Sequence, residues 1–137
     1  MLRTAVAIVS MMGLSGSVLA VEGELAREPG SVLLGRCEAA AQVLQGGIDL
    51  DPALIALAGT CVAFLDGFIF GHGWAAWREQ GDMYYCPPPD FSASAAVPVV
   101  VEYLRVHPDR ADARAHVLVF AALSAAFPCT PAGAPKQ

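Results

Sequence analysis

Apolar residues recur at helical spacing through most of the chain, and no stretch shows the alternation of a β-strand bounded by hairpin turns. The longest helical pattern runs from Leu54 to Trp77. It is preceded by Asp51-Pro52, an N-cap side chain followed by the proline that the first helical position tolerates. The positions that we expect this central helix to bury are Ile55, Ala58, Val62, Leu65 and Ile69.

The central helix also carries a stripe of small residues at every fourth position, Ala63, Gly67, Gly71 and Ala75. Glycine inside a helix costs about 1 kcal/mol relative to alanine, so the stripe predicts the close approach of another backbone. Small residues at this spacing also occur in membrane helix dimers. Asp66 argues against a membrane span, because a carboxylate near the bilayer centre costs about 2.5–3.5 kcal/mol. We therefore predict a soluble central helix.

Three further helices are predicted. Ser31 is expected to cap the first, from about Val32 to Gln45, and Gly46-Gly47 ends it. Another runs from near Ser94 to Val106 and the last from about Asp112 to Ala126. The last is apolar almost all round, which is typical of a helix that is central in the core or partly covered by another subunit. The expected inward residues of the first helix are Leu33, Leu34, Cys37, Ala41 and Leu44, and those of the helix near Ser94 are Val97, Val100, Val101 and Leu104.

Two proline-containing segments shape the second half of the chain. Cys86-Pro87-Pro88-Pro89 lacks three successive N–H groups and predicts a stiff, extended connector. Pro98 is expected in the first turn of its helix, where the missing N–H costs nothing. These elements together predict an all-α fold, a small domain of four helices.

The first twenty residues are typical of a secretory signal peptide. Arg3 supplies the positive charge, an apolar run covers Ala5 to Leu14, and Val18-Leu19-Ala20 provides small residues before a cut near Ala20. The run is too short to span a bilayer of about 30 Å. We therefore expect an exported, periplasmic protein with a flexible leader (21–30), a helical domain (31–129), a disordered tail (130–137) and no membrane span after cleavage.

The four cysteines fit an oxidising compartment, because none forms a short metal-ligand spacing. In an antiparallel helical hairpin, residues equidistant from the turn lie side by side. Cys37 and Cys61 are each twelve positions from Asp49, and Cys86 and Cys129 are equidistant from the His107-Pro108 junction. We therefore predict the pairs Cys37–Cys61 and Cys86–Cys129, which make the domain two disulfide-stapled helical hairpins.

Charge and motifs disfavour several function classes. Without Arg3, seven basic and thirteen acidic side chains give a formal charge of −6, so nucleic acid is not an expected partner. The three histidines are spread along the chain, so no metal or other cofactor is predicted. Asp66 and His72 point to different helix faces, about 600° apart, and we expect His72 at a frayed helix end. No nucleophile motif is present, so we predict no catalytic residues and no enzymatic activity.

Aromatic residues gather before and around the proline connector. Such side chains are enriched at binding hot spots, and a proline-stiffened loop presents them at low entropic cost. The alternative is that they cap the open end of a small helical core. The predicted partner-binding residues are Trp74, Trp77, Tyr84, Tyr85 and Phe91.

Four segments together resemble the Rap/Tai family of small exported immunity-type proteins found beside type VI secretion effectors. They are CVAFLDGFIFGH at Cys61–His72, CPPP at Cys86–Pro89, VVVEYLRVHPDR at Val99–Arg110 and LVFAALSAAFPC at Leu118–Cys129. The chain departs from that family at Ala63, where the family tends to have glycine, and at Pro98. The resemblance implies a helical domain with paired cysteines, often a homodimer, that blocks a peptidoglycan amidase.

The expected function is therefore that of a periplasmic, non-enzymatic immunity-type inhibitor that occludes a type VI-delivered peptidoglycan amidase. The contact surface does not follow from the resemblance, because the matching residues define the scaffold. The alternative is an envelope-stress chaperone or another periplasmic protein-interaction module. A stoichiometric complex with one enzyme would favour the first function, and weak binding to many clients the second.

Overall fold

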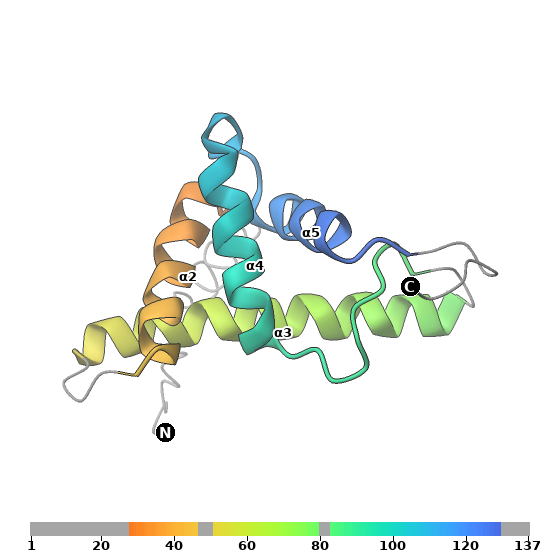
Figure 1. The fold of residues 1–137 in the computed structure, drawn as a ribbon, viewed down its shortest axis with the longest axis horizontal. Coiled ribbons are helices and arrows are strands. Elements are labelled where there is room, and N and C mark those ends of the chain that lie inside the picture. The colour runs from red at the N-terminus through yellow and green to blue at the C-terminus, as the bar shows by residue number, and fades with distance from the viewer. Residues whose placement is uncertain (1–27, 47–50, 80–82, 130–137) are drawn as a thin grey trace, which may run out of the picture.

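The computed structural model describes residues 28–46, 51–79 and 83–129 (Figure 1). Its helices are α2 (Gly30–Leu44), α3 (Pro52–Glu79), α4 (Ala93–Val106) and α5 (Ala115–Ala126), with a short 3₁₀ helix, η1 (Pro108–Arg110), between the last two. Within these ranges the only strand-like feature is one antiparallel bridge between Pro29 and Arg114. The predicted all-α fold with four helices is confirmed.

The long helix α3 forms the base of the molecule (Figure 1). Helices α2 and α4 stand steeply on it, side by side, and after the turn at η1 the chain comes down to α5, which lies above α3 on the side of its C-terminal half. Helix α2 packs on α3 and α4, and α4 packs on α3 and α5. Each predicted pair of consecutive helices is therefore in contact, but α2 crosses α3 and α4 crosses α5 at a steep angle, so the pairs are not the side-by-side antiparallel hairpins that we expected (Figure 1).

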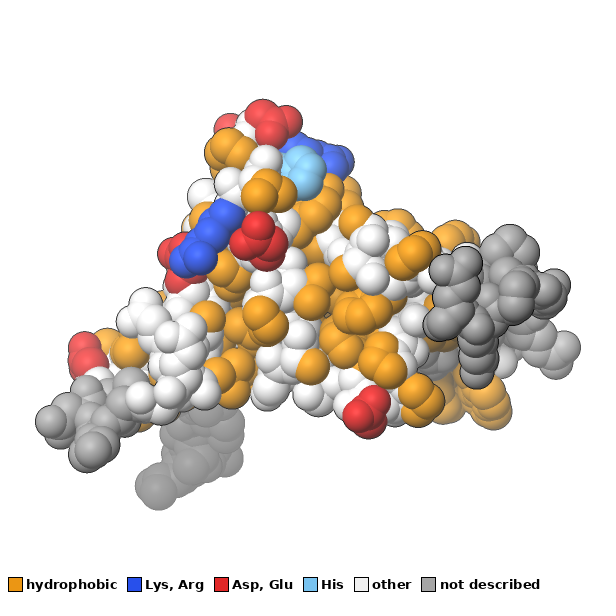
Figure 2. Space-filling view, viewed as in Figure 1, with side chains coloured by type: hydrophobic (Ala, Val, Ile, Leu, Met, Phe, Trp, Pro, Cys, Tyr) orange, Lys and Arg blue, Asp and Glu red, His pale blue; other side chains and the backbone are white. Residues whose placement is uncertain are grey.

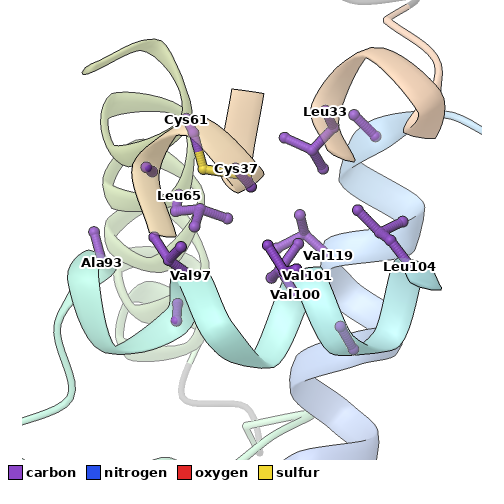
Figure 3. Close-up of a cluster of buried hydrophobic side chains, with 14 of the residues drawn as sticks. Leu33, Cys37, Cys61, Leu65, Ala93, Val97, Val100, Val101, Leu104 and Val119 are labelled. Carbon is purple, nitrogen blue, oxygen red and sulfur yellow. A yellow bond between two sulfur atoms is a disulfide. The ribbon is translucent and has the colours of Figure 1, made fainter. Parts of the chain in front are cut away.

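The core lies where the four helices meet (Figure 3), and α3 contributes to it through Ala58, Cys61 and Leu65, in its N-terminal half. All four valine and leucine positions predicted for α4 are buried. Helix α5 buries only one side, and Val117 (41%) and Phe120 (37%) remain exposed, so α5 is not central in the core. The largest fully buried side chains are Tyr85, Leu33, Leu65, Leu118, Leu123, Val97, Val100 and Val119.

Both predicted disulfides are present. Cys37 joins α2 to α3 through Cys61, with the Cα atoms 5.1 Å apart and both residues fully buried. Cys86 ties the proline connector to Cys129, just after α5, with a Cα–Cα distance of 4.9 Å. Cys86 is exposed, so the two disulfides differ in their access to solvent.

One helix start is as expected and another is not. Asp51 caps α3 by accepting from the Ala53 N–H at 3.0 Å. Ser31 does not cap α2, which already begins at Gly30. The N–H groups of Gly30 and Ser31 donate instead to the carbonyls of Ala113 and Ala111, both at 2.9 Å. The segment before α5 therefore provides hydrogen-bond acceptors for the first N–H groups of α2, which have no partner within the helix.

Gly30 is required by close packing at this junction. A Cβ placed there would lie 2.1 Å from Cδ1 of Leu118 and 3.2 Å from the carbonyl oxygen of Ala111. Leu118 is fully buried, so a side chain at position 30 would force the Leu118 side chain to shift within the packed core. The glycine therefore allows the start of α2 to rest directly on α5.

The position of Pro98 also differs from the expectation. Helix α4 begins at Ala93, where Ser92 Oγ accepts from the Ala95 N–H at 3.2 Å. Pro98 therefore falls in the second turn rather than the first. The residue is exposed, so the carbonyl of Ser94 that loses its helical partner lies on the solvent side of the helix.

Two residues expected in the core are exposed, namely Ile55 (49%) in α3 and Leu44 (51%) in α2. Both lie near helix ends, and α3 extends beyond α2 there (Figure 1). A helical pattern identifies a face but not the length along which a neighbour covers it. The predicted signal peptide (1–20), most of the leader and the tail (130–137) lie outside the described residues.

Candidate protein-binding surface

The side of α3 that points away from the core is exposed and uncharged. Of its 28 residues, only Ala58, Cys61 and Leu65 are buried. The seven residues on the opposite side are all exposed, and we call them the outward face of α3: Ala56, Gly59, Thr60, Ala63, Gly67, Phe70 and Trp74. Charged side chains instead gather at the apex, around the end of α4 and η1 (Figure 2).

By length and composition, α3 could cross a membrane, since an 18-residue window has a mean hydropathy of 2.1 and only 17% of it is buried. The core helix of a soluble protein passes the same test, but such a helix is mostly buried. Helix α3 is therefore unusual in exposing most of a strongly apolar surface. Such a surface marks an interaction site.

Four of the five predicted partner-binding aromatics fall into three separate groups. Trp74 (52% exposed) and Trp77 (71%) lie on α3 with ring centroids 5.0 Å apart. Tyr84 (74%) lies against Phe120, at 5.7 Å. Phe91 is partly buried against Phe127, at 4.7 Å. Among the described residues no ring contact connects these three groups.

Tyr85, the fifth, is only 1% exposed and belongs to the core. Its ring stacks on that of His72, with centroids 4.3 Å apart and planes at 15°. The next residue, Cys86, donates its N–H to the carbonyl of Phe127 at 2.8 Å, and its disulfide reaches Cys129. Tyr85 therefore anchors the connector beneath α5 and supports Tyr84 instead of facing a partner.

His72 lies within α3 and not at a frayed end. Its ring contacts Tyr84, Tyr85 and Phe120. The Nε2 atom of His72 and the hydroxyl of Tyr85 are both buried without a hydrogen-bond partner among the described residues. Burial lowers the pKa of His72 below 6.5 and raises the pKa of Tyr85 above 10.0, because both charged forms are poorly solvated there.

Acidification is expected to destabilise the protein through His72. A lowered pKa means that the unfolded chain binds the proton more readily, so this contribution to stability is complete above pH 6.5 and is lost as the pH falls through the folded-state pKa. Urea unfolding between pH 5 and pH 8 measures the slope. His72→Phe keeps the ring contacts without the titration, and its stability should fall less on acidification. Equal slopes for the two proteins would contradict this assignment.

The sequence interpretation missed several side chains that the structure exposes or groups. Phe70 (72% exposed) lies on the outward face of α3, in line with Trp74 at the helical spacing of four. At the apex, His107 stacks on Tyr103 at 4.2 Å and Arg110 donates to the Tyr103 hydroxyl at 2.7 Å. The spacing of three and four residues in this group was visible in the sequence.

Catalytic geometry is not found in the described ranges. Asp66 is exposed on α3, while His72 lies against the aromatic connector, so the two do not form a pair. The described residues contain no group of three or more His, Cys, Asp or Glu residues placed to hold a metal ion. The features that stand out are a disulfide-bonded helical scaffold and exposed apolar surface, which are typical of interaction sites.

Comparison with protein families identifies this scaffold. The family model described as Rap1a immunity proteins matches residues 30–129, which span all four helices and both disulfides. Searches of curated proteins and of solved structures found no significant match. The resemblance drawn from the four sequence segments is thereby confirmed, and the chain belongs to the Rap1a immunity protein family.

Proposed function

We propose that this protein is a periplasmic immunity protein that binds and occludes a peptidoglycan amidase delivered by a type VI secretion system. Membership of an immunity protein family carries the proposal. The amidase, the secretion system and the homodimeric state come from the Rap/Tai resemblance. Two disulfides suit the oxidising periplasm, to which the predicted signal peptide would direct the chain.

The proposed mechanism is steric and needs no chemistry from this chain. Two disulfides hold the helices in a fixed arrangement, so exposed side chains are presented with little loss of conformational entropy on binding. The aromatics Trp74, Trp77, Tyr84 and Phe91 are proposed to contact the toxin, and Tyr85 is proposed to support them from the core. Large aromatic anchors of this type carry much of the binding energy at protein interfaces.

An envelope-stress chaperone remains the second candidate, because the outward face of α3 exposes apolar surface that could hold unfolded clients. The two functions differ in stoichiometry. An immunity protein forms a defined complex with one enzyme, whereas a chaperone binds many clients weakly. The exposed surface alone does not distinguish them, but the family match favours the immunity function.

The test is inhibition of a purified enzyme. The oxidised mature chain is used to capture proteins from the periplasm, and any hydrolase recovered in near-equal amount is assayed for release of peptide from peptidoglycan. We expect complete inhibition at a one-to-one ratio of chains. Recovery of many unrelated proteins, without inhibition of any hydrolase, would contradict the immunity function and favour the chaperone.

Variants of exposed residues test the proposed contacts. Trp77→Ala and Tyr84→Ala should each weaken inhibition at least about tenfold, as expected for hot-spot residues. Leu44→Ala is the matched control, because Leu44 is also a large exposed side chain (51%) but lies on α2, away from the connector. Unchanged inhibition by both aromatic variants would remove this surface from the proposal.

A further inference from the structure

We propose that Cys86 is a thiol-modification site. A small thiol opens the Cys86–Cys129 disulfide of the folded protein by attack on the Cys86 sulfur, and it stays bound to Cys86 as a mixed disulfide. The helical core remains folded while the bond is open. The site itself does not depend on the proposed function; only its consequence, weaker toxin binding, rests on that function.

The two disulfides differ in how a thiol can reach them. Cys37 and Cys61 are 0% exposed and belong to the core, so their sulfur atoms become accessible only when the helices separate. Cys86 is exposed, in a connector outside the helices, and Cys129 is partly buried just after α5. The rate of thiol–disulfide exchange depends on access and on which sulfur is attacked. Exposure therefore makes Cys86 the point of attack.

The exchange step exchanges one disulfide bond for another. The thiolate of the small thiol forms a bond to Cys86 Sγ while the Cys86–Cys129 bond breaks, and the electron pair of that bond leaves on Cys129 Sγ. The Cys129 thiolate then takes a proton from water. The products are a mixed disulfide at Cys86 and a free thiol at Cys129, so the step needs no oxidant and no reductant besides the thiol itself.

The structure provides a hydrogen-bond acceptor for the thiol that is released. Cys129 Sγ lies 3.0 Å from the carbonyl oxygen of Met83. In the disulfide this sulfur carries no hydrogen, so the contact becomes a hydrogen bond only after exchange, when the Cys129 S–H can donate to the carbonyl. The open form therefore keeps Cys129 close to its place in the disulfide. From there its sulfur can displace the small thiol from Cys86 and close the same bond again.

Other contacts hold the connector in place when the disulfide is open. The N–H of Cys86 donates to the carbonyl of Phe127 at 2.8 Å, which joins the connector to the end of α5. Tyr85 is 1% exposed and its ring stacks on α3. Phe91, at the far end of the connector, packs against Phe127, with ring centroids 4.7 Å apart. Opening therefore loosens the residues between these anchors and leaves the four helices packed.

A group attached to Cys86 lies in the middle of the proposed toxin-binding connector. Tyr84, two residues before Cys86, is 74% exposed, and Phe91 follows five residues after it. A tripeptide thiol such as glutathione adds carboxylate and amino groups between these aromatic side chains. Burial of such charges against a partner is unfavourable, so the modification weakens toxin binding. Mixed disulfides of this kind are reversible. Toxin binding is therefore lowered under reducing conditions and recovers when the thiol is removed.

A matched pair of serine variants tests which sulfur is attacked. Cys129→Ser leaves the Cys86 thiol, and Cys86→Ser leaves the Cys129 thiol, in otherwise identical chains. Each variant is incubated with oxidised glutathione, and intact mass with peptide mapping measures how fast the mixed disulfide forms. We expect Cys86 to react at least about tenfold faster than Cys129, because reactivity follows exposure of the thiol. Equal rates, or a faster reaction at Cys129, would overturn the assignment.

The wild type tests the opening of the folded protein. The oxidised mature chain is treated with reduced glutathione in the absence of denaturant, quenched with acid and mapped by mass spectrometry. We expect glutathione on Cys86, a free thiol on Cys129, an intact Cys37–Cys61 disulfide and an unchanged helical circular dichroism signal. Four results would overturn the inference: no adduct, glutathione on Cys129, opening of both disulfides at the same rate, or loss of the helical signal as the bond opens.

Inhibition of the captured hydrolase tests the consequence separately. Cys129→Ser carrying glutathione at Cys86 is compared with the same variant before modification. The modified protein should inhibit at least about tenfold less strongly, and removal of the glutathione should restore inhibition. If both forms inhibit equally, the effect on toxin binding is wrong although the proposed function stands. If glutathione forms on Cys86 but neither form inhibits any hydrolase, the proposed function fails and the modification site stands.

Discussion

Tyr85→Ala is expected to lower the free energy of unfolding by about 3–5 kcal/mol, the cost of removing a large side chain from a packed core. Tyr85 is 1% exposed and is the largest fully buried side chain among the described residues. Its removal leaves His72 without the ring on which it stacks and loosens the connector beneath α5. Urea unfolding of the oxidised protein measures the effect.

The neighbouring tyrosine provides the control. Tyr84 is 74% exposed, so Tyr84→Ala should change the free energy of unfolding by less than about 0.5 kcal/mol. Tyr85→Phe should leave stability unchanged or raise it, because the buried hydroxyl has no partner among the described residues. Equal costs for the two alanine variants would show that the connector is not anchored through Tyr85.

Removal of the buried disulfide is expected to have the second large effect. The double substitution Cys37→Ala and Cys61→Ala should cost about 3–5 kcal/mol, because a loop of 24 residues is released in the unfolded chain and two fully buried sulfur atoms are lost from the core. Native proteins have a total stability of only about 5–15 kcal/mol. This variant should therefore unfold at much lower urea concentration.

The other disulfide separates loop closure from core packing. Cys86–Cys129 closes a longer loop, of 43 residues, but Cys86 is exposed. Chain entropy alone predicts a slightly larger loss of stability for this pair. We expect removal of the buried pair, Cys37–Cys61, to lower the free energy of unfolding by at least as much, because it also leaves a cavity in the core. The exposed pair should be reduced first by dithiothreitol, as measured by alkylation and mass. Faster reduction of Cys37–Cys61 would contradict the burial assignment.

The sequence by itself determined the helices, the disulfides and the family. Helical spacing of apolar residues identified each helix to within a few residues, because burial of one helix face imposes that period whatever the partner. The pairing of Cys37 with Cys61 was predicted from their equal distances to a turn, and the disulfide is present although α2 crosses α3 steeply instead of lying antiparallel to it. The Rap/Tai resemblance rested on cysteines, glycines and prolines that define the scaffold.

Only the tertiary structure decided which faces meet and which remain open. Ser31 was predicted to cap the first helix, but the first N–H groups of α2 donate instead to the carbonyls of Ala111 and Ala113, which are far along the chain. Tyr84 and Tyr85 are identical in type and adjacent in sequence, yet one is in solvent and the other in the core. Periodicity shows that a residue lies on an apolar face, but exposure depends on whether another segment reaches it. For the outward face of α3, no segment in the described part of the chain does.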